Sequence, residues 1–260
     1  MNPAAEVNPL SMLDEAARVL PGGTAVTGVN LLLMLTALAV VPSVLILCTS
    51  FTRIAITLGI LRQALGAPGI PPGQVVAGLS LFLTLVVMAP TGERMWTEGL
   101  GPWLRGEEAD RAVAWERTAE PLREFMIAQI ESTGNVDTVL TLLEHRGVDV
   151  RDPSRLTWER DVDLLTLVPA FVLSELKTAF LVGFRIWLPF LVIDLVVSSL
   201  LVSMGMIMLP PVLVSLPFKL LLFVLVDGWR LVTAGLLSGF AEPAAKVTAW
   251  LPSLSGGGLA

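Results

Sequence analysis

Seven charged side chains lie in the apolar stretches of the C-terminal half of this 260-residue chain, among them Glu175, Lys177, Asp194 and Lys219. An ionisable group inside an apolar membrane helix marks a proton or ion pathway, a catalytic group or an ion pair. If the chain reverses near residue 208, Asp194 and Lys219 differ in height by about 4.5 Å, which a lysine side chain can span. The charges therefore fit either a structural ion pair or a relay, and the structural role is the simpler interpretation.

Motifs for enzyme chemistry do not occur in the sequence. There is no His-Glu-x-x-His, no Gly-x-Ser-x-Gly and no phosphate-binding glycine-rich loop. One cysteine, Cys48, and one histidine, His145, lie far apart in the sequence, which argues against most metal and nucleophilic chemistry. A carboxylate pair of Glu175 and Asp194 remains formally possible for an intramembrane hydrolase. We expect a protein that is not an enzyme and that has no cofactor or metal.

The charged residues are concentrated in one segment. Apolar residues make up 54% of the chain and charged residues only 15%. Residues 91–163 hold 25 of the 40 charged side chains, as 16 acids and 9 arginines. This distribution argues against a disordered chain, an ordinary soluble enzyme and a nucleic-acid partner. It favours an integral membrane protein with one acidic polar domain.

Glycine and proline divide the apolar part of the chain. Gly66–Gly73 and Leu209–Pro211 are strong turn signals, whereas Pro189 and Pro217 lie inside apolar runs and predict kinks or breaks. We therefore predict an all-α fold of membrane-associated helical hairpins with kinked helices and a small helical polar domain. Its expected parts are an N-terminal segment (1–28), a first hydrophobic helical hairpin (29–90), an acidic helical domain (91–163), a second hydrophobic helical hairpin with a Met-rich loop (164–240) and a C-terminal tail (241–260).

The acidic domain has helical periodicity in two places. One helix is predicted to begin at Pro121, because proline suits a first helical turn. A second is predicted over residues 136–143, with Asn135 as its cap and Gly147 at its end. Two short amphipathic helices cannot bury their apolar faces well alone. We expect them to pack on the membrane segments of their own chain or on neighbouring chains.

Two basic residues give a topology. Phe51–Gly73 contains Arg53 and Arg62 and no acid, so the positive-inside rule places this segment on the cytoplasmic side. The acidic domain then lies on the opposite side of the membrane.

Small residues recur four positions apart, a spacing that allows helices to approach closely. The pairs are Ala179 with Gly183, Ser199 with Ser203, and Gly235 with Gly239.

The most unusual local sequence is the Met-rich segment Ser203–Pro211. Three methionines fall within five residues around Gly205, and two prolines follow. Glycine and proline predict a loop or a broken helix. Methionine is flexible and apolar, so several copies around an axis would form a soft seal. In a single chain, a Met-rich turn packed in the core is the simpler interpretation.

Several phrases of the sequence, in order, resemble the export-gate proteins of type III secretion systems, the FliP/SctR family. The resemblance covers about Leu31 to Leu237. The matching phrases are Thr49–Ile54, Leu61–Gly66, Gly78–Pro90, Pro121–Met126, Ser174–Phe180, Pro189–Asp194 and Ser203–Trp229.

The resemblance implies a non-enzymatic subunit at the core of an export gate, flagellar more than virulence-type. It implies a homo-oligomer, a pentamer in the family, with two smaller subunits of FliQ and FliR type. It also implies FlhA- and FlhB-type export components as partners and unfolded flagellar proteins as substrates. The expected place is the bacterial inner membrane at the flagellar basal body, with the acidic domain in the periplasm.

The family's methionine loop lines the central constriction. In this sequence its positions are Met206, Ile207 and Met208, and Ile207 stands where the family often has a third methionine. The alternative function from another class is a proton-coupled membrane carrier that uses Glu175, Asp194 and Lys219, although no internal repeat supports it.

Overall fold

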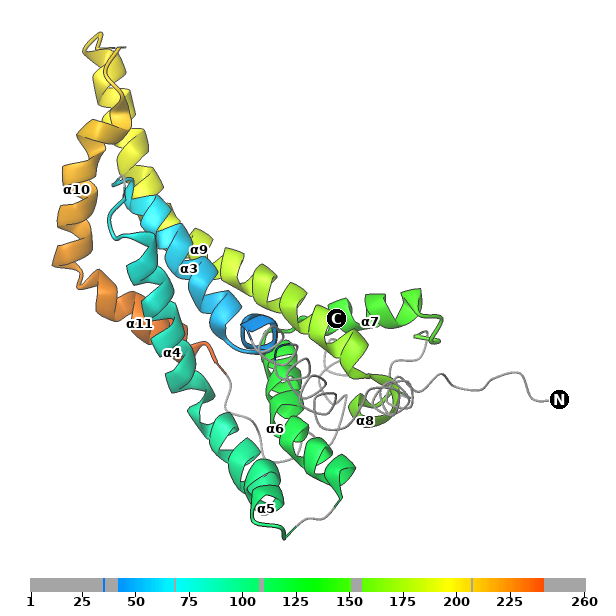
Figure 1. The fold of residues 1–260 in the computed structure, drawn as a ribbon. Helices are drawn as coiled ribbons and strands as arrows, with labels where there is room; N and C mark the ends of the chain where they lie inside the picture. Colours follow the sequence, from blue (N-terminus) through cyan, green and yellow to red (C-terminus); the bar gives the residue numbers. More distant parts are fainter. Residues whose placement is uncertain are drawn as a thin grey trace, which may run out of the picture. The chain divides into compact units, whose positions relative to one another are not determined.

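The computed structural model describes residue 35 and residues 42–67, 69–107, 110–150, 156–206 and 208–240. Regular structure within these ranges is helical throughout, which confirms the all-α class. The chain divides into two compact units, and the fold below is that of the unit Leu47–Ala260. Its helices are α3 (Phe51–Leu65), α4 (Gly73–Arg94), the π-helix η1 (Met95–Leu100), α5 (Gly101–Leu104), α6 (Arg111–Ser132), α7 (Val136–His145), α8 (Trp158–Asp161), α9 (Leu164–Ser203), α10 (Pro211–Leu225) and α11 (Gly228–Ser238) (Figure 1).

Two helical stretches have the length and composition to cross a membrane, Gly73–Leu104 and Leu164–Ser203. Two further spans are possible if a pair of shorter helices counts as one. Pro42–Cys48 with Phe51–Leu65 is one such pair, and Pro211–Leu225 with Gly228–Ser238, bent by 64°, is the other. Length and composition therefore support the predicted membrane-associated hairpins. The predicted N-terminal segment and C-terminal tail lie outside the described residues.

The helices of the acidic domain differ in one boundary from the prediction. The helix expected to begin at Pro121 begins at Arg111, and Pro121 lies inside it. The reason is a cap that the periodicity did not reveal: the Asp110 carboxylate accepts a hydrogen bond from the Ala112 N–H at 2.8 Å. The second helix, α7, spans Val136–His145 close to the predicted range.

The helices α6 and α7 bury their apolar faces on the first part of α9, as the sequence led us to expect. Phe125 of α6 meets Phe171 of α9 edge to face, with ring centroids 6.0 Å apart. Val139 and Leu143 of α7 are fully buried in the same cluster. The acidic domain therefore shares one hydrophobic core with the second apolar segment.

A second core forms where α3 packs on the middle of α9. Gly183 makes this approach close, because a Cβ atom there would lie 2.4 Å from Cδ1 of Ile60. The predicted small-residue contact at Ala179 and Gly183 is therefore confirmed. Gly235, in contrast, has nothing within 4 Å of such a Cβ atom. The pair Ala179 and Gly183 thus serves a close helix contact within this unit.

Neither predicted proline interrupts its helix. α9 continues through Pro189 and α10 through Pro217. The break lies between α10 and α11 at Asp227, which has a positive φ of 53°. Aspartate tolerates this left-handed conformation better than most residues. Each proline costs its helix a backbone hydrogen bond, and both helices nevertheless continue past it.

Candidate functional site

The Met-rich segment forms the turn between α9 and α10. The Gly205 N–H donates to the Val202 carbonyl at 3.0 Å, and the Met206 N–H donates to the Leu201 carbonyl at 2.9 Å. Gly205 has a φ of 74°, which glycine adopts without a Cβ clash. This pair of hydrogen bonds is a Schellman motif, so Gly205 determines where α9 ends and where the methionine loop begins.

The methionines of this turn point away from the chain's own core. Met204 and Met206 are exposed, and Met208 is 99% exposed. Ile207 lies outside the described residues. The turn predicted from the sequence is therefore present, with methionines on its surface instead of in the core. Their role as a seal stays a prediction.

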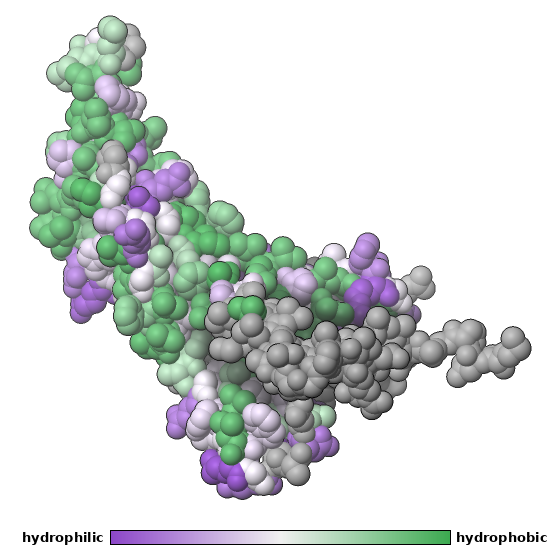
Figure 2. Space-filling model, viewed as in Figure 1, coloured by the Kyte–Doolittle hydropathy of each residue, from purple (hydrophilic) through white to green (hydrophobic). Residues whose placement is uncertain are grey.

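An apolar cleft runs from the turn along the α9–α10 hairpin. It has a volume of about 480 Å³ and only apolar lining residues. Figure 2 shows hydrophobic residues covering this part of the surface, whereas hydrophilic residues gather on the acidic domain. An exposed apolar surface of this kind marks an interaction site with protein or lipid. The lining residues are Val192, Ile193, Val196, Val197, Leu200, Leu201, Met204, Val214 and Phe218.

Asp194 and Lys219 form the ion pair that their spacing predicted, and they form it within one chain. Lys219 Nζ lies 2.6 Å from Asp194 Oδ2 and donates to the Ala64 carbonyl at 3.0 Å. The Ser215 hydroxyl donates to the other carboxylate oxygen at 2.5 Å. Ala64 is in the last turn of α3, where backbone carbonyls lack helical partners and attract a cation. The pair therefore joins α3, α9 and α10.

A second and more deeply buried ion pair joins α3 to α9. Arg53 holds Glu175 through two hydrogen bonds, Nε to Oε2 at 2.7 Å and Nη2 to Oε1 at 2.5 Å. The third nitrogen, Nη1, donates to the Gly239 carbonyl at 2.7 Å. The guanidinium also lies 4.2 Å from the ring centroid of Phe240. The two charged side chains are 2% and 0% exposed, so every nitrogen of Arg53 has a partner in the interior.

This pair corrects the use of Arg53 in the topology argument. The positive-inside rule applies to loops, but most of Phe51–Gly73 is the helix α3, and Arg53 points into the core. A buried, paired arginine does not report the cytoplasmic side as a loop charge does. Arg62 alone then supports the topology. The sequence signal that was missed is that Arg53 and Glu175 are both isolated charges in apolar surroundings.

The remaining embedded charges are not brought together. Lys177 is exposed on α9, away from the two ion pairs. Glu175 and Asp194 bind different cations and lie about 28 Å apart along α9 at 1.5 Å per residue. They therefore do not form the carboxylate pair that a hydrolase would need. Within the described ranges, no group of three His, Cys, Asp or Glu side chains is placed to hold a metal ion.

Comparison with known proteins gives one consistent result. The model of the FliP family matches residues 34–236. A flagellar biosynthetic protein FliP from Bacillus subtilis is 49% identical over 212 residues, covering 82% of this chain and 91% of that protein. FliP from Pectobacterium carotovorum is 47% identical over 220 residues, covering 84% of this chain and 81% of its own length. FliP from Aquifex aeolicus is 42% identical, covering 84% and 88%.

Proposed function

This chain belongs to the FliP family of flagellar biosynthetic proteins, and we propose that it forms, with further copies of itself, a channel for unfolded flagellar export substrates. Membership makes it a component of the flagellar export apparatus with apolar helices suited to a membrane. The proposal adds that the Met-rich turn, Met206 to Met208, lines and seals the centre of the channel.

The observation that carries this proposal is the exposure of the Met-rich turn and of the apolar cleft beside it. A turn with Met208 99% exposed buries little apolar surface within its own chain. Burial of apolar area stabilises by about 25 cal/mol per Å², so this surface favours a partner. Copies arranged around an axis would bring their turns together, and flexible methionines would fill the gap between them and adapt to a passing chain.

The proposed assembly is a homo-oligomer of this chain, a pentamer as in the family. Two smaller types of subunit, FliQ and FliR, join it. FlhA- and FlhB-type components would stand beside it. We place it in the bacterial inner membrane at the flagellar basal body, with residues 91–163 in the periplasm. The buried pairs Arg53–Glu175 and Asp194–Lys219 would then hold each subunit rigid while the Met-rich turn deforms.

The contacts favour this function over a proton-coupled carrier. A carrier would need Glu175 or Asp194 to exchange protons with a pathway. Glu175 is fully buried and bound at both oxygens by Arg53, and Asp194 is bound by Lys219 and Ser215. These contacts are those of structural ion pairs. Proton-dependent transport by the purified chain alone in liposomes would reverse this preference.

The experiment is ion conductance of the assembled complex in a planar bilayer. Replacing Met206, Ile207 and Met208 together by alanine is expected to raise the leak of small ions while the complex still assembles. Met95→Ala is the matched control, because Met95 is partly buried in η1, far along the chain from the turn. It should leave the conductance unchanged. A triple variant that assembles normally and remains as tight as the parent protein would refute the seal.

A further inference from the structure

Arg62, near the end of α3, is a partly buried cation with no hydrogen bond or ion pair to any residue that the structure describes. The two apolar hairpins, residues 47–90 and 164–240, offer no unpaired carboxylate to Arg62. The acids there are Glu175, Asp194 and Asp227, and each already pairs with another cation. Partial burial of a charge without a partner is costly. Among the described residues, the positive charge of Arg62 is therefore left without a counter-ion.

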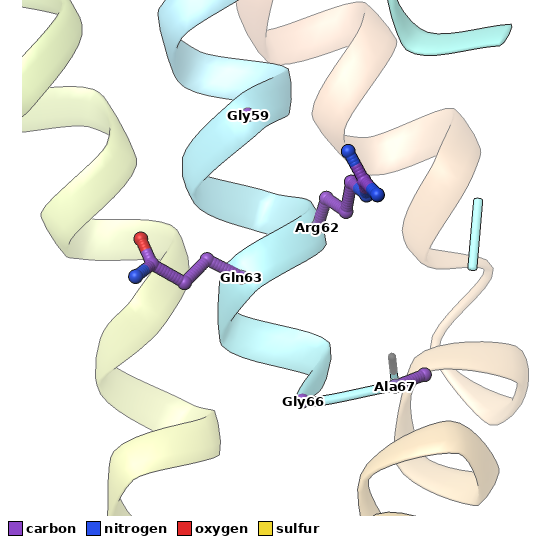
Figure 3. A pocket seen from close by; sticks show the side chains of 5 residues that line it. All are labelled: Gly59, Arg62, Gln63, Gly66 and Ala67. Carbon is purple, nitrogen blue, oxygen red and sulfur yellow. The ribbon is translucent and has the colours of Figure 1, made fainter. Parts of the chain in front are cut away.

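Arg62 lines an open pocket of about 380 Å³ at the C-terminal end of α3, with Gly59, Gln63, Gly66 and Ala67 (Figure 3). The figure shows Arg62 and Gln63 leaving α3 on different sides. Three of the lining residues are glycine or alanine. A Cβ atom at Gly59 would meet nothing within 4 Å. The pocket is therefore open space beside a guanidinium group, walled mainly by backbone.

The start of α4 adds positive potential at the same place. A Cβ atom on Gly73, the first residue of α4, would lie 3.2 Å from Arg62 Nη1. The first turn of α4 contains no acid and has no side-chain cap. The N–H groups of Val75 and Val76 donate to the Pro72 carbonyl, whereas those of Gly73 and Gln74 have no helical partner and carry partial positive charge. The guanidinium of Arg62 therefore lies beside the positive end of α4.

The surface that leads away from the pocket is apolar. Along α4, Val75, Phe82, Leu85 and Val86 are all exposed. These residues belong to Gly73–Leu104, one of the two stretches that can cross a membrane. A ligand with a negative head and a long apolar part fits this arrangement, whereas a soluble anion leaves the apolar surface of α4 uncovered.

We propose that Arg62 and this pocket bind the phosphate group of a phospholipid whose acyl chains lie along α4. The guanidinium presents a planar set of donors that matches phosphate oxygens. The proposal rests on the membrane location given above but not on the channel or its seal. Lipid bound here would fix the junction of α3 and α4 beside the ion pair of Lys219, whose Nζ would lie 3.5 Å from a Cβ on Gly66.

The test is native mass spectrometry of the full chain in detergent, with dioleoyl phosphatidylglycerol as the probe. Arg62→Gln is expected to weaken the tightest lipid-binding event at least about tenfold. Arg62→Lys keeps the positive charge but lacks the planar set of donors. Its lipid affinity should lie between that of the parent protein and that of Arg62→Gln. Arg185→Gln is the matched control, since Arg185 is an exposed cation on α9 outside the pocket. It should bind lipid as the parent protein does.

Gly59→Leu provides a second, independent variant. It fills the pocket while keeping Arg62, and the open space at Gly59 lets the fold persist. Loss of the same lipid from Gly59→Leu supports the pocket even if Arg62→Gln folds poorly. Because this measurement does not read ion conductance, a failure of the seal proposal would leave its result intact.

Three outcomes would overturn the proposal. The first is lipid binding by Arg62→Gln and Gly59→Leu that equals the parent's. The second is an equal loss in Arg185→Gln, which would show a general charge effect. The third is a rise of the melting temperature with inorganic phosphate that depends on Arg62 while lipid binding does not. This last result would assign the pocket to soluble phosphate.

Discussion

The two halves of α9 are equally apolar but have different surroundings. In the first half, Leu167 and Phe171 are fully buried under α6 and α7. In the second half, Leu195, Leu200 and Val202 are exposed beside the Met-rich turn. The same kind of sequence therefore forms an internal core at one end and an uncovered surface at the other.

The difference shows that apolar content alone does not tell which surface is buried by the chain's own helices. The first half of α9, buried in this way, is called the completed half below, and the second half the open half. The first half is next to polar helices whose buried faces need α9. The second half packs on α3 and α10 as far as Asp194, but beyond it Leu195, Leu200 and Val202 stay exposed. We therefore expect substitutions in the first half to change the stability of the chain itself, and substitutions in the second half to change its assembly.

The largest effect on stability is expected at Glu175, which lies in the completed half of α9. Glu175→Gln leaves Arg53 as a buried charge without its counter-ion, which costs about 3–5 kcal/mol. The free energy of unfolding of the detergent-solubilised chain, from denaturant titration, measures this loss. Asp194→Asn is the comparison in the second half of α9. A smaller loss is expected because the buried Lys219 keeps its hydrogen bond to the Ala64 carbonyl and Asp194 itself is 31% exposed.

The double variant Arg53→Leu with Glu175→Leu separates the cost of an unpaired charge from the loss of the other contacts that Arg53 makes. Removing both charges abolishes the unpaired ion, so most of the lost stability should return. If the double variant is less stable than Glu175→Gln, the bonds of Arg53 to Gly239 and Phe240 matter more than the ion pair does.

Two leucines on α9 compare its halves directly. Leu167 is 0% exposed and Leu195 is 69% exposed. Leu167→Ala should destabilise the chain by about 2–5 kcal/mol, because it opens a cavity in the core. Leu195→Ala should change the free energy of unfolding by less than about 0.5 kcal/mol but lower the yield of assembled complex on native mass spectrometry. Equal stability losses at both positions would contradict the distinction.

The sequence predicted the elements with their own local signals and missed those set by distant contacts. Gly66 and Gly205, which need positive φ, end α3 and α9 where turns were expected. Asp194 and Lys219 were paired correctly because a single reversal relates them. Arg53 and Glu175 were not, since 122 residues separate them and no local pattern links the two.

The prolines show how far one local signal reaches. Pro189 and Pro217 predict kinks or breaks, and α9 and α10 continue through them without a break. The break lies at Asp227-Gly228, a dipeptide typical of turns, which was a local signal for it. At the Met-rich turn, the exposure of the methionines depends on what surrounds the hairpin, and periodicity in one chain carries no information on that.

Two glycines allow the same comparison with smaller expected changes in stability, because one lies at a close helix contact and the other at an open position. Gly183→Ala brings a methyl group to 2.4 Å from Ile60 Cδ1, and such overpacking costs about 1–3 kcal/mol. Gly235→Ala meets nothing within 4 Å in α11 and should stabilise that helix by about 0.4–1 kcal/mol. Melting temperatures of the two variants should move in opposite directions. A stabilising Gly183→Ala would mean that α3 and α9 can separate at little cost.

The smallest effect is expected at the start of α9, where Asp163 caps the helix. Its carboxylate accepts a hydrogen bond from the Thr166 N–H at 3.1 Å and pairs with Arg146 of the acidic domain. The hydrogen bond from Arg146, followed by that from Thr166, lowers the pKa of Asp163 below its ordinary value.

Because the folded-state pKa of Asp163 is lowered, the contact stabilises the fold above the ordinary pKa of about 3.9. The stabilisation is lost as pH falls through the lowered folded-state pKa. Both side chains are nearly half exposed, so the contribution should stay below about 1 kcal/mol. Arg146→Gln should raise the pKa of Asp163 towards its ordinary value in an NMR titration and flatten the acid limb of the stability curve. An unchanged titration of Asp163 would mean that the helix cap alone sets its pKa, and that the completed half of α9 is held to the acidic domain by apolar packing and not by charge.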